Sequence, residues 1–362
     1  MKIRIITHHS VHNHGAVLQL LALRNVLAKY DASVCALSYT KNYDFFDDFA
    51  DTKYNISIKS IPYYLGYLAK KGLKRTWFNV QKKKTLDHYR EENHLVGEYY
   101  TRCKDLDAVF VGSDEVFSIE PGLNPCFWGM GVPCKHVFAY AGCFGPTTTD
   151  FIQEKNAVEY IKAGIDRFER ISVRDLNSQS IIKELSGKNV PQLCDPVILY
   201  GYQEEKKKFK RPMEEKYLFI YAYDENLNDP AEVERIRKYA DSKNLKVVTA
   251  AFYHKWCDRS VNADPIELLE WVNGAECVVT DTFHGTVMSM VMNTPFATRI
   301  RGNRNKLGYL LSEYKLESRE TKDFSDLDRI FAAPMDFENL NHIIEEKRTD
   351  GMTYIKDCLS EV

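Results

Sequence analysis

The sequence predicts an α/β protein made of two Rossmann-like domains, and three observations lead to this prediction. The chain has 362 residues, which is too long for one ordinary core and fits two domains of about 150 to 200 residues each. Short apolar segments rich in β-branched residues alternate with helical segments, as in parallel sheets covered by helices. The alternation starts again at residue 217, after a charged stretch at 201–216 without apolar periodicity, which is typical of a linker.

The first series of elements, which we assign to an N-terminal domain over residues 1–200, opens with strand, helix and strand. KIRIIT is a short β-branched run, and GAVLQLLALRNVLAKY has apolar residues on nearly all faces of a helix, which predicts that this helix is buried. A second strand at 33–39 completes a β-α-β unit. Further strands are predicted at 107–114, 136–142 and 170–175, and the last leads into a helix that ends near Ser186.

One segment of the first series departs from this alternation. Residues 42 to about 94 are rich in tyrosine, lysine and phenylalanine, with Pro62 and Gly66 as interruptions. Because proline and glycine break helices, we predict an irregular helical insertion over about 42–100. Its basic residues are Lys70, Lys71, Lys74, Arg75 and Lys82 to Lys84, interleaved with Leu73, Trp77 and Phe78. This pattern fits either a solvated helix face or peripheral contact with an anionic membrane.

The second series predicts a C-terminal domain over residues 217–336. Strands are expected at YLFIYAY, KVVTAAFY, CVVTDT and PFATRI, and helices at 230–243, IELLEWVNGA, from His284 onward and at NKLGYLLSEY. A long helix, assigned to residues 337–362, ends the chain. Two Rossmann-like units followed by a terminal helix form the architecture of B-type glycosyltransferases, so the predicted fold is GT-B-like.

Composition excludes several classes of protein. Lysine and arginine number 49 against 51 acidic residues. This balance gives no excess of positive charge for binding nucleic acid. The nine cysteines form no CxxC pair, which argues against a zinc cage or a redox dithiol. No apolar run approaches the ~20 residues of a membrane span, and MKIRIITHHS runs into a strand rather than a signal-peptide core. We therefore expect a cytoplasmic protein.

Polar clusters follow the ends of four predicted strands. They lie at 12–15, 112–114, 172–175 and 280–285. Ligands of parallel α/β sheets bind at the carboxyl ends of the strands, where loops and helix N-termini converge. These clusters are therefore the candidate site.

His284 gives the sharpest of these signals. It lies between a buried strand, CVVTDT, and a buried helix, GTVMSMVMN. The helix amides and dipole favour an anion there, so a phosphate or carboxylate could bind beside an imidazole that transfers protons near neutral pH. Alternatively, His284 caps its helix or satisfies a buried carbonyl.

The turn at 12–15 introduces the first helix. Gly15 allows the backbone to approach a ligand while the helix N-terminus attracts negative charge. The turn lacks the GxGxxG pattern, so no nicotinamide cofactor is expected. Four histidines, His8, His9, His12 and His14, have no neighbouring cysteines or paired carboxylates, which favours ordinary loop or acceptor-site histidines over a metal site.

Asp114, Arg174 and a later group of arginines each have two interpretations. Asp114 could accept a hydroxyl proton or orient a sugar, or it could cap a helix. Arg174 offers a planar fork to a carboxylate or phosphate, or pairs with Asp175 or another acid. Arg299, Arg301 and Arg304 could engage an anion or form a solvated basic loop.

In their order along the chain, these clusters resemble the polysaccharide pyruvyl transferase family. That family has an asparagine-aromatic-glycine-alanine turn before a glutamine-bearing helix, then VGSD, SVRE, LDP and a late SDSFHG or RLHG turn. This chain has NHGAVLQ, VGSD, SVRD, CDP and TDTFHGTVMS. The resemblance spans about residues 6–319, and the joint order is far more specific than any single motif.

The resemblance implies transfer of pyruvate from phosphoenolpyruvate to a hexose or hexosamine of a bacterial surface glycan precursor, as a cyclic ketal and without a cofactor. The acceptor could be carried by a lipid. By motif, His284 matches the catalytic histidine and Arg174 the donor-binding arginine. We expect the acceptor on the side of the N-terminal domain and the donor on the side of the C-terminal domain.

Further roles follow as hypotheses. Asp114 is expected to be the base acting on a sugar hydroxyl. The remaining donor-side candidates are Thr282, Gly285, Arg299 and Arg301. The acceptor-side candidates are Asn13, His14, Gly15, Gln19 and Ser113. Family members with RLHG carry an arginine where this chain has Thr282, so we expect Arg299 or Arg301 to supply that anion contact.

Two other functions fit the same architecture. One is a glycosyltransferase that uses a nucleotide sugar, for which Tyr253 or Trp256 could stack on the base. The other is a non-catalytic protein of a glycan-assembly complex, in which the His284 turn would be disrupted. That turn is intact here.

Overall fold

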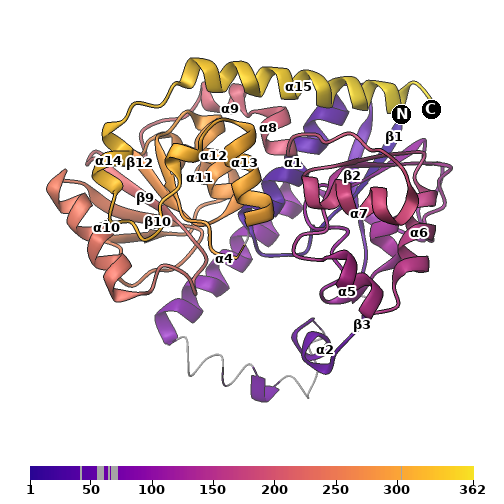
Figure 1. The fold of residues 1–362 in the computed structure, drawn as a ribbon, viewed down its shortest axis with the longest axis horizontal. Coiled ribbons are helices and arrows are strands. Elements are labelled where there is room, and N and C mark those ends of the chain that lie inside the picture. The colour runs from indigo at the N-terminus through magenta and orange to yellow at the C-terminus, as the bar shows by residue number, and fades with distance from the viewer. Residues whose placement is uncertain (41–42, 55–60, 64–65, 67–71, 303) are drawn as a thin grey trace.

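The computed structural model describes residues 1–40, 43–54, 61–63, 66, 72–302 and 304–362. Lys70 and Lys71 of the predicted basic stretch lie outside the described residues. Two parallel sheets dominate the molecule, with helices on their faces (Figure 1). The chain is therefore an α/β protein of two Rossmann-like domains, as the alternation of elements predicts.

The first sheet contains six parallel strands in the order β4-β2-β1-β5-β7-β8. Their bounds are β1 Lys2–Ile6, β2 Ser33–Ser38, β4 Val96–Tyr99, β5 Ala108–Val111, β7 His136–Gly142 and β8 Arg170–Val173. β5 is buried along its whole length, as expected for a central strand with helices on both faces. The carboxyl ends of β5 and β8 point toward the same edge because every pairing is parallel.

The second sheet contains five parallel strands in the order β11-β10-β9-β12-β13. Their bounds are β9 Tyr217–Tyr221, β10 Lys246–Ala250, β11 Arg259–Val261, β12 Cys277–Thr280 and β13 Phe296–Thr298. β9 and β12 are buried throughout. β11 is an edge strand that the sequence analysis does not predict, because three residues carry too little pattern to be recognised.

Several helices join the two halves. α1 (His14–Ala28) is apolar on nearly all sides and packs against α8 (Pro196–Tyr200) and against α11 (Pro265–Asn273) of the second half. α12 (Phe283–Met292) is buried at every position. α15 (Phe337–Leu359) runs along both halves (Figure 1), and its Tyr354 hydroxyl donates to the carbonyl of Ala139 in β7.

The predicted insertion contains both helices and a strand. α2 (Asp48–Tyr54) and the 20-residue α4 (Leu73–Glu92) are helical as predicted, but the segment ends in β4, the edge strand of the first sheet. β4 has the sequence VGEY, too short and too polar for its strand character to be recognised. A two-residue strand, β3 (Asp44–Phe45), pairs antiparallel with β6 (Gly122–Leu123).

The remaining helices cover the sheets and fill the connections. They are α5 Thr149–Glu154, α6 Val158–Arg167, α7 Leu176–Ser186, α9 Gln203–Lys206, α10 Pro230–Ser242, α13 Tyr309–Glu313 and α14 Leu327–Ala332. Two short 3-10 helices, η2 Pro125–Trp128 and η4 Glu317–Arg319, and one π-helix, η3 Arg304–Gly308, complete the set. α9 lies inside the stretch predicted as a linker. In the described part of the chain, none of the helices combines the length and hydropathy of a membrane span.

Candidate active site

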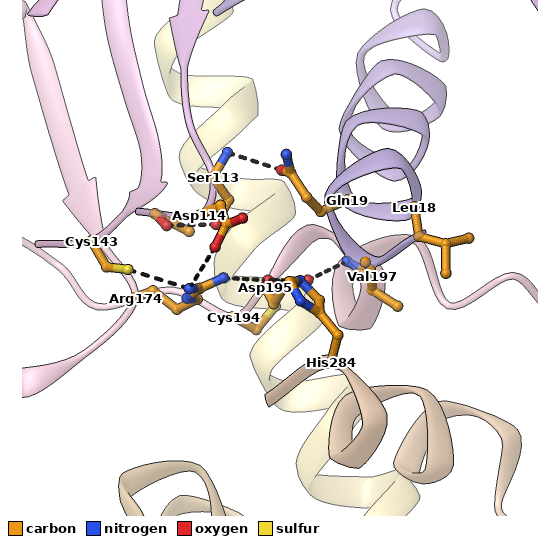
Figure 2. A network of polar contacts seen from close by, with 12 residues as sticks. Leu18, Gln19, Ser113, Asp114, Cys143, Arg174, Cys194, Asp195, Val197 and His284 are labelled. Carbon is orange, nitrogen blue, oxygen red and sulfur yellow. Dashed lines mark hydrogen bonds and ion pairs between the residues drawn. The ribbon is translucent and has the colours of Figure 1, made fainter. Parts of the chain in front are cut away.

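The candidate site lies where the carboxyl ends of strands from both sheets meet. Asp114 follows β5, Arg174 follows β8, and His284 begins α12 after β12. Asp195 caps α8, with its Oδ1 accepting from the amide of Val197 at 2.9 Å. Figure 2 shows these four side chains pointing toward one another from separate elements.

Arg174 is the centre of a buried chain of charges. Its Nη1 donates to Asp195 Oδ2 at 2.7 Å, and its Nη2 lies 3.3 Å from Asp114 Oδ1. The same Nη2 is 3.2 Å from Cys143 Sγ, and the guanidinium lies 4.3 Å from the ring centre of Phe283. The side chain is 3% exposed. Two carboxylates therefore already satisfy Arg174 inside the protein.

His284 lies at the start of α12 without capping it. The cap is Thr282, whose Oγ1 accepts from the amide of Gly285 at 2.9 Å. His284 Nε2 is buried, finds no hydrogen-bond partner among the described residues, and lies 3.8 Å from Asp195 Oδ2. Burial is the main cause that lowers the pKa of His284, while Asp195 and Asp114 act in the opposite direction. The imidazole is thus mostly neutral, and its buried Nε2 makes no hydrogen bond to the described residues.

Gly15 allows α1 to approach the imidazole. A Cβ atom at Gly15 would lie 2.4 Å from His284 Cγ and 2.5 Å from Nδ1. Asn13 caps α1, with its Oδ1 accepting from the Gly15 amide at 2.8 Å. The N-termini of α1 and α12 therefore meet at His284, which adds positive potential there.

Gly15→Ala is expected to displace the imidazole and lower activity by about 100-fold, the effect of a misplacement of ~1 Å. The helix should gain up to about 1 kcal/mol from alanine, so any destabilisation would report the clash. Steady-state kinetics and urea unfolding measure both effects. Gly302→Ala, where a Cβ meets no atom within 4 Å, is the control. A Cβ at position 15 would also lie 2.8 Å from His284 Cβ, so only Gly15→Ala/His284→Gly removes the whole clash. That double variant should be no less stable than His284→Gly alone; if it is less stable, the clash is not the cause.

Asp114 is held by a tightly supported loop. Its φ is 73° and that of Gly112 is 126°, both in the left-handed region that disfavours side chains. Ser113 anchors the loop through its Oγ to the Ala141 carbonyl and through its amide to Gln19 Oε1. Burial alone would raise the pKa of Asp114, but Arg174, followed by His284 and Lys306, holds this pKa well below its usual range. Asp114 is therefore ionised and weakly basic while Arg174 remains its partner.

A cavity of about 480 Å³ opens in front of His284. Polar residues lining it include Asn13, Asp114, Glu115, His284 and Lys306. Lys306 pairs with Glu115. Burial would lower the pKa of Lys306, but Cys143 and Glu115 raise it above its ordinary value, so Lys306 is a cation. The cavity lining thus combines the cation of Lys306, paired with Glu115, with the imidazole of His284 and the carboxylate of Asp114.

The structure brings together only part of the predicted site. Asn13, Asp114, Thr282 and His284 line the cavity. Gly15 contacts the His284 ring and Gly285 packs on Thr280 and Thr282. Arg174 does not line the cavity and lies behind Asp114, which does.

Three other predicted site residues have buried side chains that bond within the protein. His14 Nε2 bonds to the carbonyl of Ala263 at 2.8 Å, and its burial lowers the pKa to about 4. Gln19 and Ser113 are fully buried and support the Asp114 loop. Because their polar atoms are turned into the protein, none of these three side chains lines the described cavity for an acceptor.

Arg299 and Arg301 also lie outside the lining of this cavity. Both pair with Glu232 of α10, and Arg301 Nε donates to Asp281 Oδ2 at 2.7 Å. Because these acids engage both guanidinium groups, the anion contact expected of Arg299 or Arg301 in place of Thr282 stays a prediction.

Lys306 and Asp195 were missed as site residues. Lys306 lies in a segment that was interpreted only as a helix, and a lone lysine gives no signal from sequence. Asp195 belongs to the CDP motif, which was recognised without a role for its carboxylate. In the described part of the chain, no group of three metal-ligating side chains occurs.

The fold and the candidate site define the class of protein as GT-B-like, with the candidate site between two Rossmann-like domains. A Listeria monocytogenes protein described as a UDP-N-acetylglucosamine 2-epimerase aligns with a TM-score of 0.53 and 11% identity, covering 100% of this chain and 97% of its own. The S. aureus MnaA-UDP structure aligns with a TM-score of 0.51 and 12% identity, covering 96% and 91%. At these identities the likeness shows the fold alone.

The family model for polysaccharide pyruvyl transferase matches residues 13–299. The chain therefore belongs to the polysaccharide pyruvyl transferase family and is a transferase of polysaccharide biosynthesis. The search of curated proteins finds no match to the chain.

Proposed function

We propose that the protein transfers the pyruvyl group of phosphoenolpyruvate to two hydroxyls of a sugar in a surface polysaccharide precursor, which forms a cyclic ketal. The observation that carries the proposal is the partnerless Nε2 of His284 beside Asp195, at a cavity that also holds Lys306 and the Arg174-bound carboxylate of Asp114. Family membership supports the transferred group.

The donor has two anionic groups, and two cations are candidates to bind them: Lys306 in the cavity lining and Arg174 behind Asp114. Lys306 is placed to bind phosphate or carboxylate directly, because it lines the cavity. Arg174 is linked to the cavity through Asp114. The ion pair with Asp114, at 3.3 Å, is longer than the pair with Asp195, and the side chain of Asp114 is 19% exposed. A donor anion could take the place of Asp114 on Arg174. Asp114 would then lose the cation that lowers its pKa and become a stronger base for a sugar hydroxyl.

The reaction needs one acid and a path for two hydroxyl protons. In the proposed sequence, protonated His284 gives its proton to the methylene carbon of the donor, while a sugar hydroxyl attacks the adjacent carbon and loses its proton to Asp114. The C–O bond to phosphate then breaks, and the second hydroxyl closes the ring and releases its proton. One released proton restores His284 and the other leaves with phosphate, so the products are the ketal and inorganic phosphate.

Asp195 has the role of positioning and charging His284. The arriving donor adds negative charge near an imidazole that is neutral by burial, and Asp195, 3.8 Å away, stabilises the resulting cation. Both effects raise the pKa of a histidine. The general acid is therefore formed when the donor binds.

Asp195→Asn should move the alkaline limb of kcat, which reports the donor complex, to lower pH by about one unit, the lower end for a charge within ~4–6 Å. The sign follows because removing an anion lowers the pKa of His284, so the protonated acid is lost at lower pH. Asparagine keeps an oxygen for the Val197 amide. Asp175→Asn is the control, since Asp175 caps α7. An unchanged limb would show that Asp195 does not charge His284.

Melting experiments test the donor. Phosphoenolpyruvate should raise the melting midpoint, because a ligand at 100 times its Kd stabilises by about 2.7 kcal/mol. The rise should be lost in Lys306→Gln and kept in Lys162→Gln, a surface control. Phosphate release that depends on an added sugar diol would then establish transfer. A rise with nucleotide sugars alone would overturn the proposal in favour of a glycosyltransferase.

A further inference from the structure

α4 carries an exposed apolar stripe. Leu73 is 86% exposed, Trp77 66% and Val80 42%. Their spacing of four and then three residues places them on one face of the helix. Within the described residues, no other helix or strand has more than one exposed large hydrophobic side chain. Such an exposed apolar face indicates a binding surface, because burying apolar groups away from water lowers the free energy.

The opposite face of α4 holds the helix to the protein. Arg75 pairs with Asp224 at 3.0 Å and with Glu225 at 2.8 Å. Lys82 lies 4.8 Å from the ring centre of Phe252, and Phe78 is buried. Two cations of the predicted basic stretch therefore point inward and are unavailable to an outside partner.

The remaining described cations of this stretch flank the apolar stripe. Lys74, Lys83 and Lys84 are exposed, and the sequence LKRTWFNVQKKK, over residues 73–84, contains no acidic residue. The first acid of the helix is Asp87. The N-terminal turns of α4, which carry the stripe, lie at the lower left of the ribbon in Figure 1. This end of the helix therefore presents apolar and positively charged groups together.

We infer that this outward face, defined as Leu73, Lys74, Trp77, Val80, Lys83 and Lys84, binds an anionic lipid surface. Tryptophan and leucine bury at the level of the headgroups, while lysines reach the lipid phosphates of an anionic membrane. Protein interfaces are depleted in lysine, so the three lysines favour lipid over a protein partner.

The same helix borders a route to the candidate active site. A second cavity, of about 1150 Å³, is lined by Arg75, Asn79, Lys82 and Lys83 of α4. It shares Asn13 and Tyr223 with the cavity in front of His284. A glycan whose lipid anchor stays in the bilayer could therefore extend along α4 to the imidazole. The delivery of a lipid-anchored glycan along α4 rests on the proposed pyruvyl transfer, whereas the lipid contact itself does not.

Vesicle sedimentation tests the contact. The full-length protein should pellet with phosphatidylglycerol–phosphatidylcholine vesicles, and much less with phosphatidylcholine alone or at high salt. Leu73→Ser/Trp77→Ser and Lys74→Gln/Lys83→Gln/Lys84→Gln should each reduce the bound fraction at least tenfold. Leu176→Ser removes a 52% exposed leucine of α7 and should bind as the parent does. Trp77 fluorescence should shift to the blue on binding.

Unchanged pelleting of both variants would overturn the inference, as would a vesicle-independent change in oligomeric state caused by Leu73→Ser/Trp77→Ser. Phosphate release with a water-soluble acceptor should be unaltered in that variant. If vesicle binding follows the face but no acceptor is pyruvylated, the lipid contact stands and the proposed function fails.

Discussion

His284→Ala is expected to lower turnover by about 10²–10⁴-fold, the contribution of a general acid, with little change in stability. The imidazole borders an open cavity, and its Nε2 gives no hydrogen bond to the described protein, so its loss leaves no buried group unpaired. The cap of α12 remains on Thr282. Steady-state phosphate release and thermal melting measure the two effects.

The control for this prediction is His88→Ala on α4, where the side chain is 77% exposed. His284→Gln keeps a polar side chain of similar reach and should be as inactive as His284→Ala, because an amide cannot supply the proton. Turnover near the parent value in either His284 variant would remove the imidazole from the mechanism.

Arg174→Ala is expected to destabilise the protein by about 3–5 kcal/mol, as measured when one partner of a buried ion pair is removed. Asp195, whose side chain is fully buried, would lose its 2.7 Å partner, and Asp114 would lose its nearest cation. Urea unfolding at neutral pH gives the free energy directly. Activity should fall as well, because both carboxylates of the site would change charge.

Arg170→Ala is the matched control, since Arg170 lies in β8, which Arg174 directly follows, and pairs with Glu361 at 42% side-chain exposure. Exposed pairs contribute about 0–1 kcal/mol. Adding Asp195→Asn to Arg174→Ala should restore part of the lost stability by removing the unpaired charge. Equal losses for Arg170→Ala and Arg174→Ala would show that the Arg174 network is not a buried ion-pair system.

The ion pair of Asp114 and Arg174 also gives a pH dependence with a defined sign. The folded-state pKa of Asp114 is below its ordinary value. Its contribution to stability is therefore present above the unfolded pKa of ~4 and is lost as pH falls through the lowered folded value.

Much of the fold was predictable because its strands are buried on both faces. β5, β9 and β12 are continuous apolar runs, the pattern of central parallel strands. The edge strands β4 and β11 were missed because they are short, polar and partly exposed. The strand conformation of β4 and β11 is instead stabilised by pairing with β2 and β10.

The sequence by itself determined which motifs face the cleft, because the topology of parallel sheets brings strand ends together: Asp114, Arg174 and His284 follow from strand positions and motif order. Only the tertiary structure decided how these groups share charge. Arg174 is held by Asp195 and Asp114, Lys306 takes the cavity-lining position expected of Arg299 or Arg301, and His14 and Gln19 turn inward. Such pairings join residues far apart in sequence, and burial, which no local pattern specifies, determines which polar groups must pair with each other.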